Sequence, residues 1–296
     1  MNEFDRLVYL TIAYSSYFSF ALNKSEILKR LPFSSSFKYL FYGERQSPKK
    51  VLISQQKINN SLKKLLELSL IETDGEYFYL QKKDLQNRKQ RTVFYDFKNE
   101  EAMAFAKMAS IIPFVKAVAL TGSAAVGNAL KDDDLDFMII CQSNTLWLTR
   151  FLLIILVKLK GKRPVFNKPN SWCINLFLDE SDLVLDQNRR SLYEAYEVLQ
   201  MQFLFDRGQY EKLFLNANHW LKKYLAYYSD CKFSQYKENK SFSLINQLFF
   251  FIQKTYRLAI FGKENFSLSP TQAFFNDINF KNKLIGSLKK QTIIKE

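Results

Sequence analysis

The fold of this chain is decided by residues 120–141, which read LTGSAAVGNALKDDDLDFMIIC. The stretch joins two apolar runs and carries Asp134 and Asp136 at the start of the second run. Residues two apart in a strand point to the same face, so these two carboxylates are predicted to project side by side. An unpaired carboxylate within an apolar run is costly, and a divalent cation would remove that cost. Oxygen ligands of this kind suit Mg²⁺, with Mn²⁺ as the alternative ion.

Gly122 and Ser123 stand where the first apolar run ends. Glycine lets the backbone approach a ligand closely, and Ser123 offers a hydroxyl and a backbone N–H at the predicted start of a short helix. The N-terminus of a helix attracts phosphate. The stretch therefore predicts phosphate donors at the end of one strand and metal ligands on the next. That layout suits a nucleoside triphosphate (NTP) with bound Mg²⁺.

The spacing of these residues resembles the signature of the polymerase-β-like nucleotidyltransferase superfamily. In this chain the signature consists of Gly-Ser, the ten residues 124–133, and Asp-Leu-Asp between apolar flanks. The resemblance covers residues 115–140. LTGSAAVGNA (120–129) and LWLTRFLL (146–153) also resemble a bacterial branch of the superfamily that has a winged helix ahead of the catalytic domain. The resemblance implies a central α/β domain with a mixed sheet.

The resemblance also implies a reaction. A nucleoside monophosphate would pass from an NTP to a hydroxyl acceptor, which is tRNA or another RNA, a protein side chain or a small molecule, and pyrophosphate would leave. Asp134 and Asp136 would be the catalytic residues and would hold the metal ions, while Gly122 and Ser123 would bind the β- and γ-phosphates. Two metal ions clamp the attacking and leaving oxygens in such a reaction.

The chain departs from the family signature at the third carboxylate. In the family this residue lies on a later strand, and the matching strand here, predicted over 172–178, carries Asn175. Asn175 can bind a metal ion through its carbonyl oxygen but cannot act as a base. Asp179 and Glu180 follow at once and are the alternatives for this role.

A second departure concerns the phosphate contacts. Ala124 and Val126 stand where many small members of the family carry arginines. Cations from elsewhere in the chain must then contact the triphosphate. The candidates are Lys131 and Arg150, followed by Lys162 and Arg163.

Three domains are expected in a chain of 296 residues, and together they give an α+β fold class. Residues 1–92 are predicted to form a winged helix-turn-helix, 93–190 the nucleotidyltransferase domain, and 191–296 a helical C-terminal domain. In the first domain three helices precede Thr73-Asp74-Gly75, and Asp-Gly between two β-rich runs is a strong hairpin signal. The polar segment 82–91 is interpreted as a linker or an extension of the wing.

Apolar periodicity predicts the remaining elements. The chain beyond Ser191 is expected to be helical, and its tail is expected to end in one more helix. Strands are predicted over 115–120, 135–140 and 172–178, and helices over 100–112, 146–159 and 281–290.

The net charge of +14 favours polyanionic partners. Residues 1–92 contribute +7 of it, from 16 Lys and Arg against 9 Asp and Glu. Asn59, Asn60 and Lys63 lie on the polar face of the third predicted helix and would face RNA or DNA. The alternative is that this unit packs on the catalytic domain and positions a substrate or a protein partner.

A rival function follows from the same observations. The chain could be a nucleic-acid-binding regulator whose nucleotidyltransferase domain is catalytically degenerate, as Asn175 would allow. Bases could stack on Tyr77 or Tyr79 of the predicted wing.

Several other classes of protein are disfavoured. His219 is the single histidine, which argues against histidine-based metal centres and Ser-His-Asp triads. Three separated cysteines favour a reducing compartment over a disulfide framework. No secretory signal is visible, and the apolar run 151–157 is far shorter than the roughly 20 residues that cross a bilayer. We therefore expect a cytoplasmic protein that does not contact a membrane.

Overall fold

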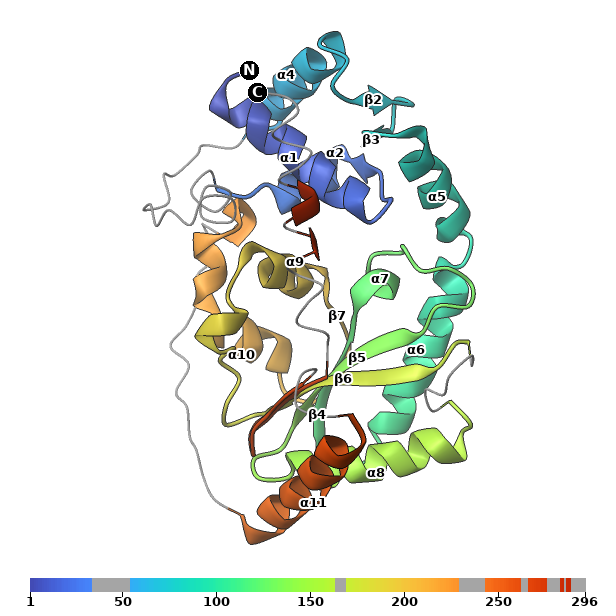
Figure 1. The fold of residues 1–296 in the computed structure, drawn as a ribbon, viewed down its shortest axis with the longest axis vertical. Helices are drawn as coiled ribbons and strands as arrows, with labels where there is room; N and C mark the ends of the chain where they lie inside the picture. Colours follow the sequence, from blue (N-terminus) through green and yellow to red (C-terminus); the bar gives the residue numbers. More distant parts are fainter. Residues whose placement is uncertain are drawn as a thin grey trace.

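A six-stranded mixed β-sheet lies at the centre of the computed structural model (Figure 1). The structure describes residues 1–33, 54–162, 169–228, 243–261, 266–275, 283–284 and 286–288. Arg163 and half of the helix predicted over 281–290 lie outside the described residues, and residues 283–284 and 286–288 have helical backbone.

Three of the strands are those that the sequence predicts. They are β4 (Val115–Thr121), β5 (Leu135–Cys141) and β6 (Trp172–Asp179). β5 lies between the other two, antiparallel to β4 and parallel to β6. Both faces of these strands are covered, which explains why they are continuous apolar runs rather than alternating ones.

Helices cover the two faces of the sheet in separate groups (Figure 1). One face packs against α6 (Tyr95–Ala109), α8 (Leu146–Leu159) and α11 (Leu244–Phe261). The other packs against α9 (Leu192–Gln200) and α10 (Tyr210–Ala217). The α+β class is confirmed. The predicted helix over 146–159 is confirmed residue for residue, whereas α6 begins and ends earlier than the predicted 100–112.

The prediction of an entirely helical region beyond Ser191 is wrong. β7 (Gln202–Asp206) pairs with β4, and β9 (Gln272–Phe274) pairs with β6 and with β8 (Ser267–Leu268). The full strand order is β7-β4-β5-β6-β9-β8. These short strands supply backbone partners to the outer edges of β4 and β6, whose unpaired N–H and C=O groups would otherwise be left open.

The N-terminal unit combines helices with a small sheet. Its described helices are α1 (Glu3–Tyr17), α2 (Lys24–Arg30) and α4 (Gln55–Glu67). The small sheet has the order β1-β3-β2, with β1 at Leu22–Asn23, β2 at Glu72–Thr73 and β3 at Tyr77–Tyr79.

Local side-chain contacts explain why these elements begin and turn where they do. Asn23 caps α2 through a capping box with Glu26. In the β2–β3 turn, Asp74 accepts hydrogen bonds from two backbone N–H groups, and Gly75 adopts a φ of 99°. The predicted hairpin is therefore present.

The interpretation of residues 82–91 as a linker or wing extension is wrong, because they form helix α5 (Lys82–Thr92). Asp84 closes a capping box at its start and accepts a hydrogen bond from Ser16 at 2.6 Å. Arg88 stacks on the Phe20 ring at 4.1 Å. Arg91 donates to Asn128 at 2.7 Å. The helix is polar because it contacts its neighbours through charged side chains rather than apolar ones.

A continuous core joins the N-terminal unit to the C-terminal region. The ring of Tyr14 in α1 lies 4.4 Å from that of Tyr196 in α9. The Tyr196 hydroxyl donates to the carbonyl oxygen of Arg30 at 2.8 Å. Both tyrosines are nearly fully buried, so these contacts hold α1, α2 and α9 in one arrangement.

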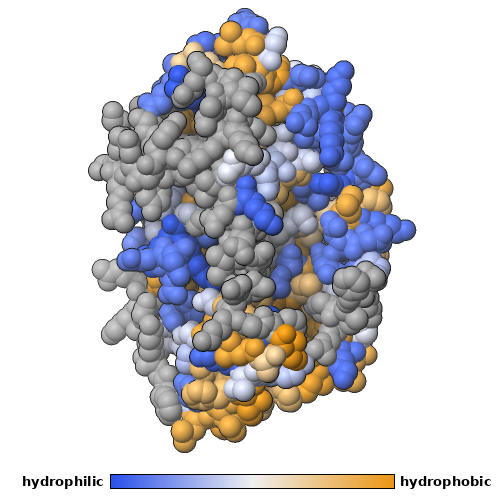
Figure 2. Space-filling view, viewed as in Figure 1, coloured by the Kyte–Doolittle hydropathy of each residue, from blue (hydrophilic) through white to orange (hydrophobic). Residues whose placement is uncertain are grey.

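Apolar side chains gather on the surface over α8 and α11, at the lower end of the view in Figure 2. None of the helices within the described ranges combines the length and the hydropathy that crossing a membrane requires. The exposed apolar residues of these helices include Phe151, Ile155, Leu244, Leu248, Phe251 and Ile252.

Replacing Phe105 with alanine should destabilise the fold strongly. Phe105 in α6 is fully buried, and its ring stacks 3.9 Å from that of Phe137 in β5. We expect the free energy of unfolding to fall by about 3–5 kcal/mol in urea denaturation. Phe97→Ala is the matched control, because Phe97 lies on the same helix with 43% of its surface exposed, and its loss should be under about 1 kcal/mol. Equal losses in the two variants would contradict the assigned packing of α6.

Candidate active site

The turn after β4 brings the backbone unusually close to a carboxylate. Gly122 opens the four-residue helix α7 (Gly122–Ala125) with a φ of 67°. A Cβ atom at this position would lie 3.0 Å from Oδ2 of Asp136. Thr121 and Asp136 are directly paired across β4 and β5, which fixes this approach. Only glycine combines the left-handed backbone with the space that the carboxylate takes.

Asn175 lies on the same side of the sheet as Asp136, because it is two residues after Cys173, the strand partner of Asp136. The pairing of β5 and β6 shifts by one residue directly after it, because Phe137 pairs with Ile174 and Met138 pairs with Leu176. Asn175 is therefore the extra, unpaired residue of a β-bulge. Its Nδ2 donates a short hydrogen bond to Oδ1 of Asp136.

Asp134 is held by the segment that precedes β6. Its Oδ1 accepts a hydrogen bond from the backbone N–H of Ser171 at 2.7 Å, and its Oδ2 lies 3.6 Å from the thiol of Cys173. Lys98 of α6 is almost fully buried and supports the same loops, because it donates to the carbonyl oxygen of Asp133 and to Asn170. Burial lowers the pKa of Lys98.

The carboxylate of Asp136 sits in an environment that disfavours its charge. Burial, followed by the negative charge of Asp134, raises the pKa of Asp136 to about 7, and the hydrogen bond from Asn175 opposes this shift. Among the described residues, Asn175 is the one hydrogen-bond donor to this carboxylate. A cation beside Asp136 would remove the penalty.

Asp136 and Asn175 line a cavity of about 480 Å³ between the sheet and the N-terminal unit. Gly122 and the exposed Ser123 are also part of its wall, whereas Asp134 is not. The structure thus brings four of the predicted site residues to one cavity and leaves Asp134 just outside it. The remaining lining residues are Tyr14, Ser15, Phe18, Phe20, Arg30, Thr121, Val126, Asn128, Tyr193, Glu197, Gln200 and Phe275.

The three predicted phosphate-binding cations that the structure describes do not line this cavity. Lys131 is exposed in the loop before β5. Arg150 lies on α8, donates to Gln253, and has its guanidinium 4.4 Å from the centre of the Phe275 ring. Lys162 forms an ion pair with Glu101 at 2.5 Å.

Arg30 is a cation in the cavity wall that the sequence reasoning missed. It is 8% exposed, and burial lowers the pKa of its guanidinium. Among the described residues it forms no ion pair, and its guanidinium lies 5.7 Å from the Phe20 ring. The sequence pattern contained a sign of this burial. Arg30 follows the buried Ile27 by three residues, which puts both on the inward face of α2.

Asp179 and Glu180, the alternative third carboxylates, lie at the opposite end of β6. The sheet register pairs Asp136 with Cys173 but Asp179 with Cys141. Five residues of strand separate these pairs, which corresponds to about 16 Å. Asp179 instead accepts a hydrogen bond from the backbone of Asn144 at 2.7 Å. Neither alternative supplies a carboxylate to the cavity.

No group of three or more His, Cys, Asp or Glu side chains close enough to hold a metal ion occurs in the described part of the chain. The possible protein ligands at the start of β5 are Asp134, Asp136 and the amide oxygen of Asn175, and the Glu197 carboxylate also lines the cavity. With so few protein ligands, phosphate oxygens and water would have to complete the coordination of an ion, as is usual for Mg²⁺.

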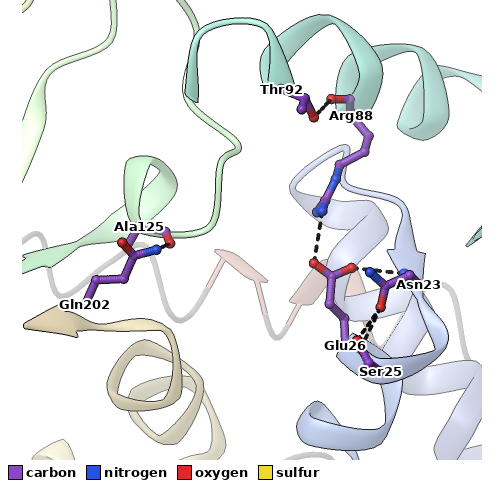
Figure 3. A network of polar contacts seen from close by, with 7 residues as sticks. All are labelled: Asn23, Ser25, Glu26, Arg88, Thr92, Ala125 and Gln202. Carbon is purple, nitrogen blue, oxygen red and sulfur yellow. Dashed lines mark hydrogen bonds and ion pairs between the residues drawn. The ribbon is translucent and has the colours of Figure 1, made fainter. Parts of the chain in front are cut away.

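A second cavity of about 440 Å³ lies beside the first and shares Arg30, Val126 and Gln200 with it. Figure 3 shows the polar contacts around it. Arg88 donates to Glu26 at 3.0 Å, and Gln202 of β7 donates to the carbonyl oxygen at the end of α7. These contacts fix α2, α5 and β7 around α7.

Asp136→Asn should stabilise the metal-free protein at alkaline pH. The folded-state pKa of about 7 lies above the ordinary value of 3.8, so the folded protein holds a proton that the unfolded chain releases. Stability conferred by this proton is fully present below about pH 3.8, is lost progressively as pH rises from 3.8 to about 7, and is absent above that. In EDTA at pH 8 we expect the variant to exceed the wild type by at least about 1 kcal/mol in free energy of unfolding, and we expect this difference to shrink steadily as pH is lowered from 7 to 4.

The control for this measurement is Asp132→Asn, which changes an exposed carboxylate of the same loop. Its difference from the wild type should change little between pH 4 and pH 8. An Asp136→Asn protein that is less stable than the wild type at pH 8 would show that the carboxylate is not destabilised by its surroundings.

Comparison with protein-family models, with curated proteins and with solved structures finds no match to this chain. The function must therefore be argued from the residues of the site. These are a glycine turn against a partly buried aspartate, an amide on the neighbouring strand that donates to it, and a cavity lined by a buried arginine.

Proposed function

We propose that this protein is a Mg²⁺-dependent nucleotidyltransferase, which transfers a nucleoside monophosphate from an NTP to a hydroxyl acceptor and releases pyrophosphate. The approach of Gly122 to Asp136 carries this proposal. It places the backbone N–H groups of a glycine turn beside a carboxylate whose charge is disfavoured by burial. Both line one wall of a cavity whose volume falls within the range of ligand pockets. Mn²⁺ is the alternative ion.

The arrangement of strands supports the finer assignment of a polymerase-β-type domain. The Gly-Ser turn follows β4, Asp134 directly precedes β5, Asp136 lies at its start, and the strand with Asn175 lies next to β5. That is the order which the resemblance requires. The N-terminal helices, followed by the β2–β3 hairpin, likewise support a winged helix-turn-helix.

The residues of the cavity can divide the work of binding and positioning. Ser123 and the adjacent N–H groups would donate to the β- and γ-phosphates, and Arg30 would offset their charge in place of the missing arginines. Metal ions held by Asp134 and Asp136, when bound, would neutralise the triphosphate and the leaving pyrophosphate. The apolar walls from Phe18, Phe20 and Phe275 would exclude water from the transfer.

Incubation with α-³²P-labelled ATP, GTP, CTP or UTP tests this proposal. The protein would be mixed with each nucleotide, Mg²⁺ or Mn²⁺, and a total cell extract that supplies RNA, protein and small-molecule acceptors. We expect the wild type to transfer label from at least one nucleotide. Transfer should fall by about 100-fold or more when Asp134 and Asp136 are both changed to Asn, because the charge that holds the metal ions is lost.

Asp132→Asn is again the control, since it removes a carboxylate from the same loop but not from the site. A folded Asp134→Asn/Asp136→Asn protein with wild-type transfer would contradict the proposal. Absence of transfer from all four nucleotides with the wild-type protein would also contradict it, and would favour the second candidate below.

The second candidate is a nucleic-acid-binding regulator with a catalytically degenerate nucleotidyltransferase domain. The exposed face of α4 favours it, because Asn59, Asn60 and Lys63 all point to solvent there. The expected stacking of bases on the wing is not supported, because Tyr79 is 6% exposed and the Arg88 guanidinium lies 5.2 Å from the centre of the Tyr77 ring. RNA or DNA binding through this unit would rely on α4 and on charge.

Salt dependence of binding would identify such a surface. If α4 binds RNA or DNA, affinity should fall steeply between 50 and 200 mM salt, and Lys63→Ala should reduce the slope of log K against log salt by about 1. Fluorescence anisotropy with labelled duplexes and single strands measures this. Lys107→Ala, on α6, is the control for a lost surface charge. Equal effects of the two changes would contradict a role for α4.

A further inference from the structure

The cavity lacks a carboxylate on β6, because Asn175 stands there and the next two acids lie at the far end of the strand. We propose that Glu197, on helix α9, supplies the third carboxylate of the site and accepts the proton of the attacking hydroxyl group. This inference rests on the proposed nucleotidyl transfer. It assigns the base to a helix that follows the sheet rather than to a strand within it.

The geometry of α9 directs Glu197 into the cavity. Tyr193, Glu197 and Gln200 are spaced four and three residues apart, so they share one face of the helix, and all three line the cavity with Asp136. The opposite face carries Leu192 and Ala195, which are buried in the core.

Neighbouring contacts hold that orientation. Tyr196 precedes Glu197 and is fixed by the ring of Tyr14 at 4.4 Å and by its hydrogen bond to the Arg30 carbonyl oxygen at 2.8 Å. Rotation of α9 would break both contacts. The direction of Glu197 is therefore set by packing and not by its own polar contacts.

Glu197 has no hydrogen-bond or ion-pair partner among the described residues, although it is partly buried. The nearby acid Glu194 is engaged by the hydroxyl of Ser191. Arg30 lines the same cavity and attracts Glu197, but no ion pair within 4.0 Å joins them. An acid held in a cavity wall without a structural partner is available to a ligand.

The electrostatic surroundings of Glu197 suit proton transfer. Burial, followed by the charge of Asp136, raises the pKa of Glu197 to about 7, while Arg30 opposes the shift. A general base is most effective when its pKa lies near the working pH. The charge of Asp136 acts on Glu197 because both side chains line the same cavity. A carboxylate on α9 can therefore serve the site although it does not belong to the sheet.

The step conserves atoms and charge. The acceptor O–H bond breaks and its proton passes to the Glu197 carboxylate. The acceptor oxygen forms a bond to the α-phosphorus. The bond from that phosphorus to the oxygen bridging to the β-phosphorus breaks, and its electron pair leaves with pyrophosphate. Glu197 then returns the proton to water.

Steady-state transfer from the α-labelled NTPs tests this role, using full-length Glu197→Gln. The amide has the same shape but cannot accept the proton, so we expect kcat to fall by about 100-fold or more while KM for the NTP changes less than about threefold. Glu67→Gln makes the same change at an exposed position on α4 and should leave both constants unaltered. Thermal melting of each variant checks that it is folded.

Glu197→Asp keeps the measurement decisive if the amide variant folds poorly. It retains a carboxylate that is one methylene shorter, and it should keep more activity than Glu197→Gln. This inference would be overturned if folded Glu197→Gln kept the wild-type kcat. It would also be overturned if the variant had a lower KM and a higher kcat, because Glu197 would then only repel the phosphates. Either outcome leaves the proposed function intact. A wild-type protein that transfers no label contradicts the proposed function itself, and with it the role of Glu197.

Discussion

The contact between Gly122 and Asp136 is the constraint on which the rest of the site depends. A Cβ atom at residue 122 would lie only 3.0 Å from Oδ2 of Asp136, so a side chain there would clash with the carboxylate. Direct pairing of Thr121 with Asp136 in the sheet leaves neither group room to move away. The start of α7 and the carboxylate therefore share one cavity wall. Asn175, two residues after the strand partner of Asp136, adds an amide to the same place.

The cavity in front of this contact exists only because distant parts of the chain pack together. The sheet forms one wall, α1 and α2 form a second, and α9 forms a third. The ring contact between Tyr14 and Tyr196 joins α1 to α9. Asn128, which follows α7, accepts a hydrogen bond from Arg91 and donates one to the carbonyl oxygen of Phe18, and so ties the sheet side of the cavity to the N-terminal unit. Burial by these walls explains the shifted pKa values in the cavity, because charged groups lose their hydration there.

The sequence predicted the inner strands because their apolar runs are long and unambiguous. The sequence-based predictions were wrong for one highly charged helix and for short strands, whose composition and length resemble those of other structures. Residues 82–91 carry so many charges that they suggest a linker, yet Asp84 and Arg88 bind partners on α1 and α2 and so form a helix. β7 is five residues long, and its apolar spacing from α9 mimics the continuation of a helix. Pairing with β4 decides its conformation, and that pairing is not local.

By itself the sequence determined the Gly-Ser turn, Asp136 near the start of the next strand, and Asn175 on a later strand, because each depends on local spacing. The tertiary structure alone decided which charges meet them. It excluded Lys131 and Arg150 from the cavity wall and placed Arg30 and Glu197 there, although these lie 92 residues before and 75 residues after Gly122. Contacts over such separations are set by the packing of whole elements, whereas local periodicity indicates only which face of a helix is turned inward.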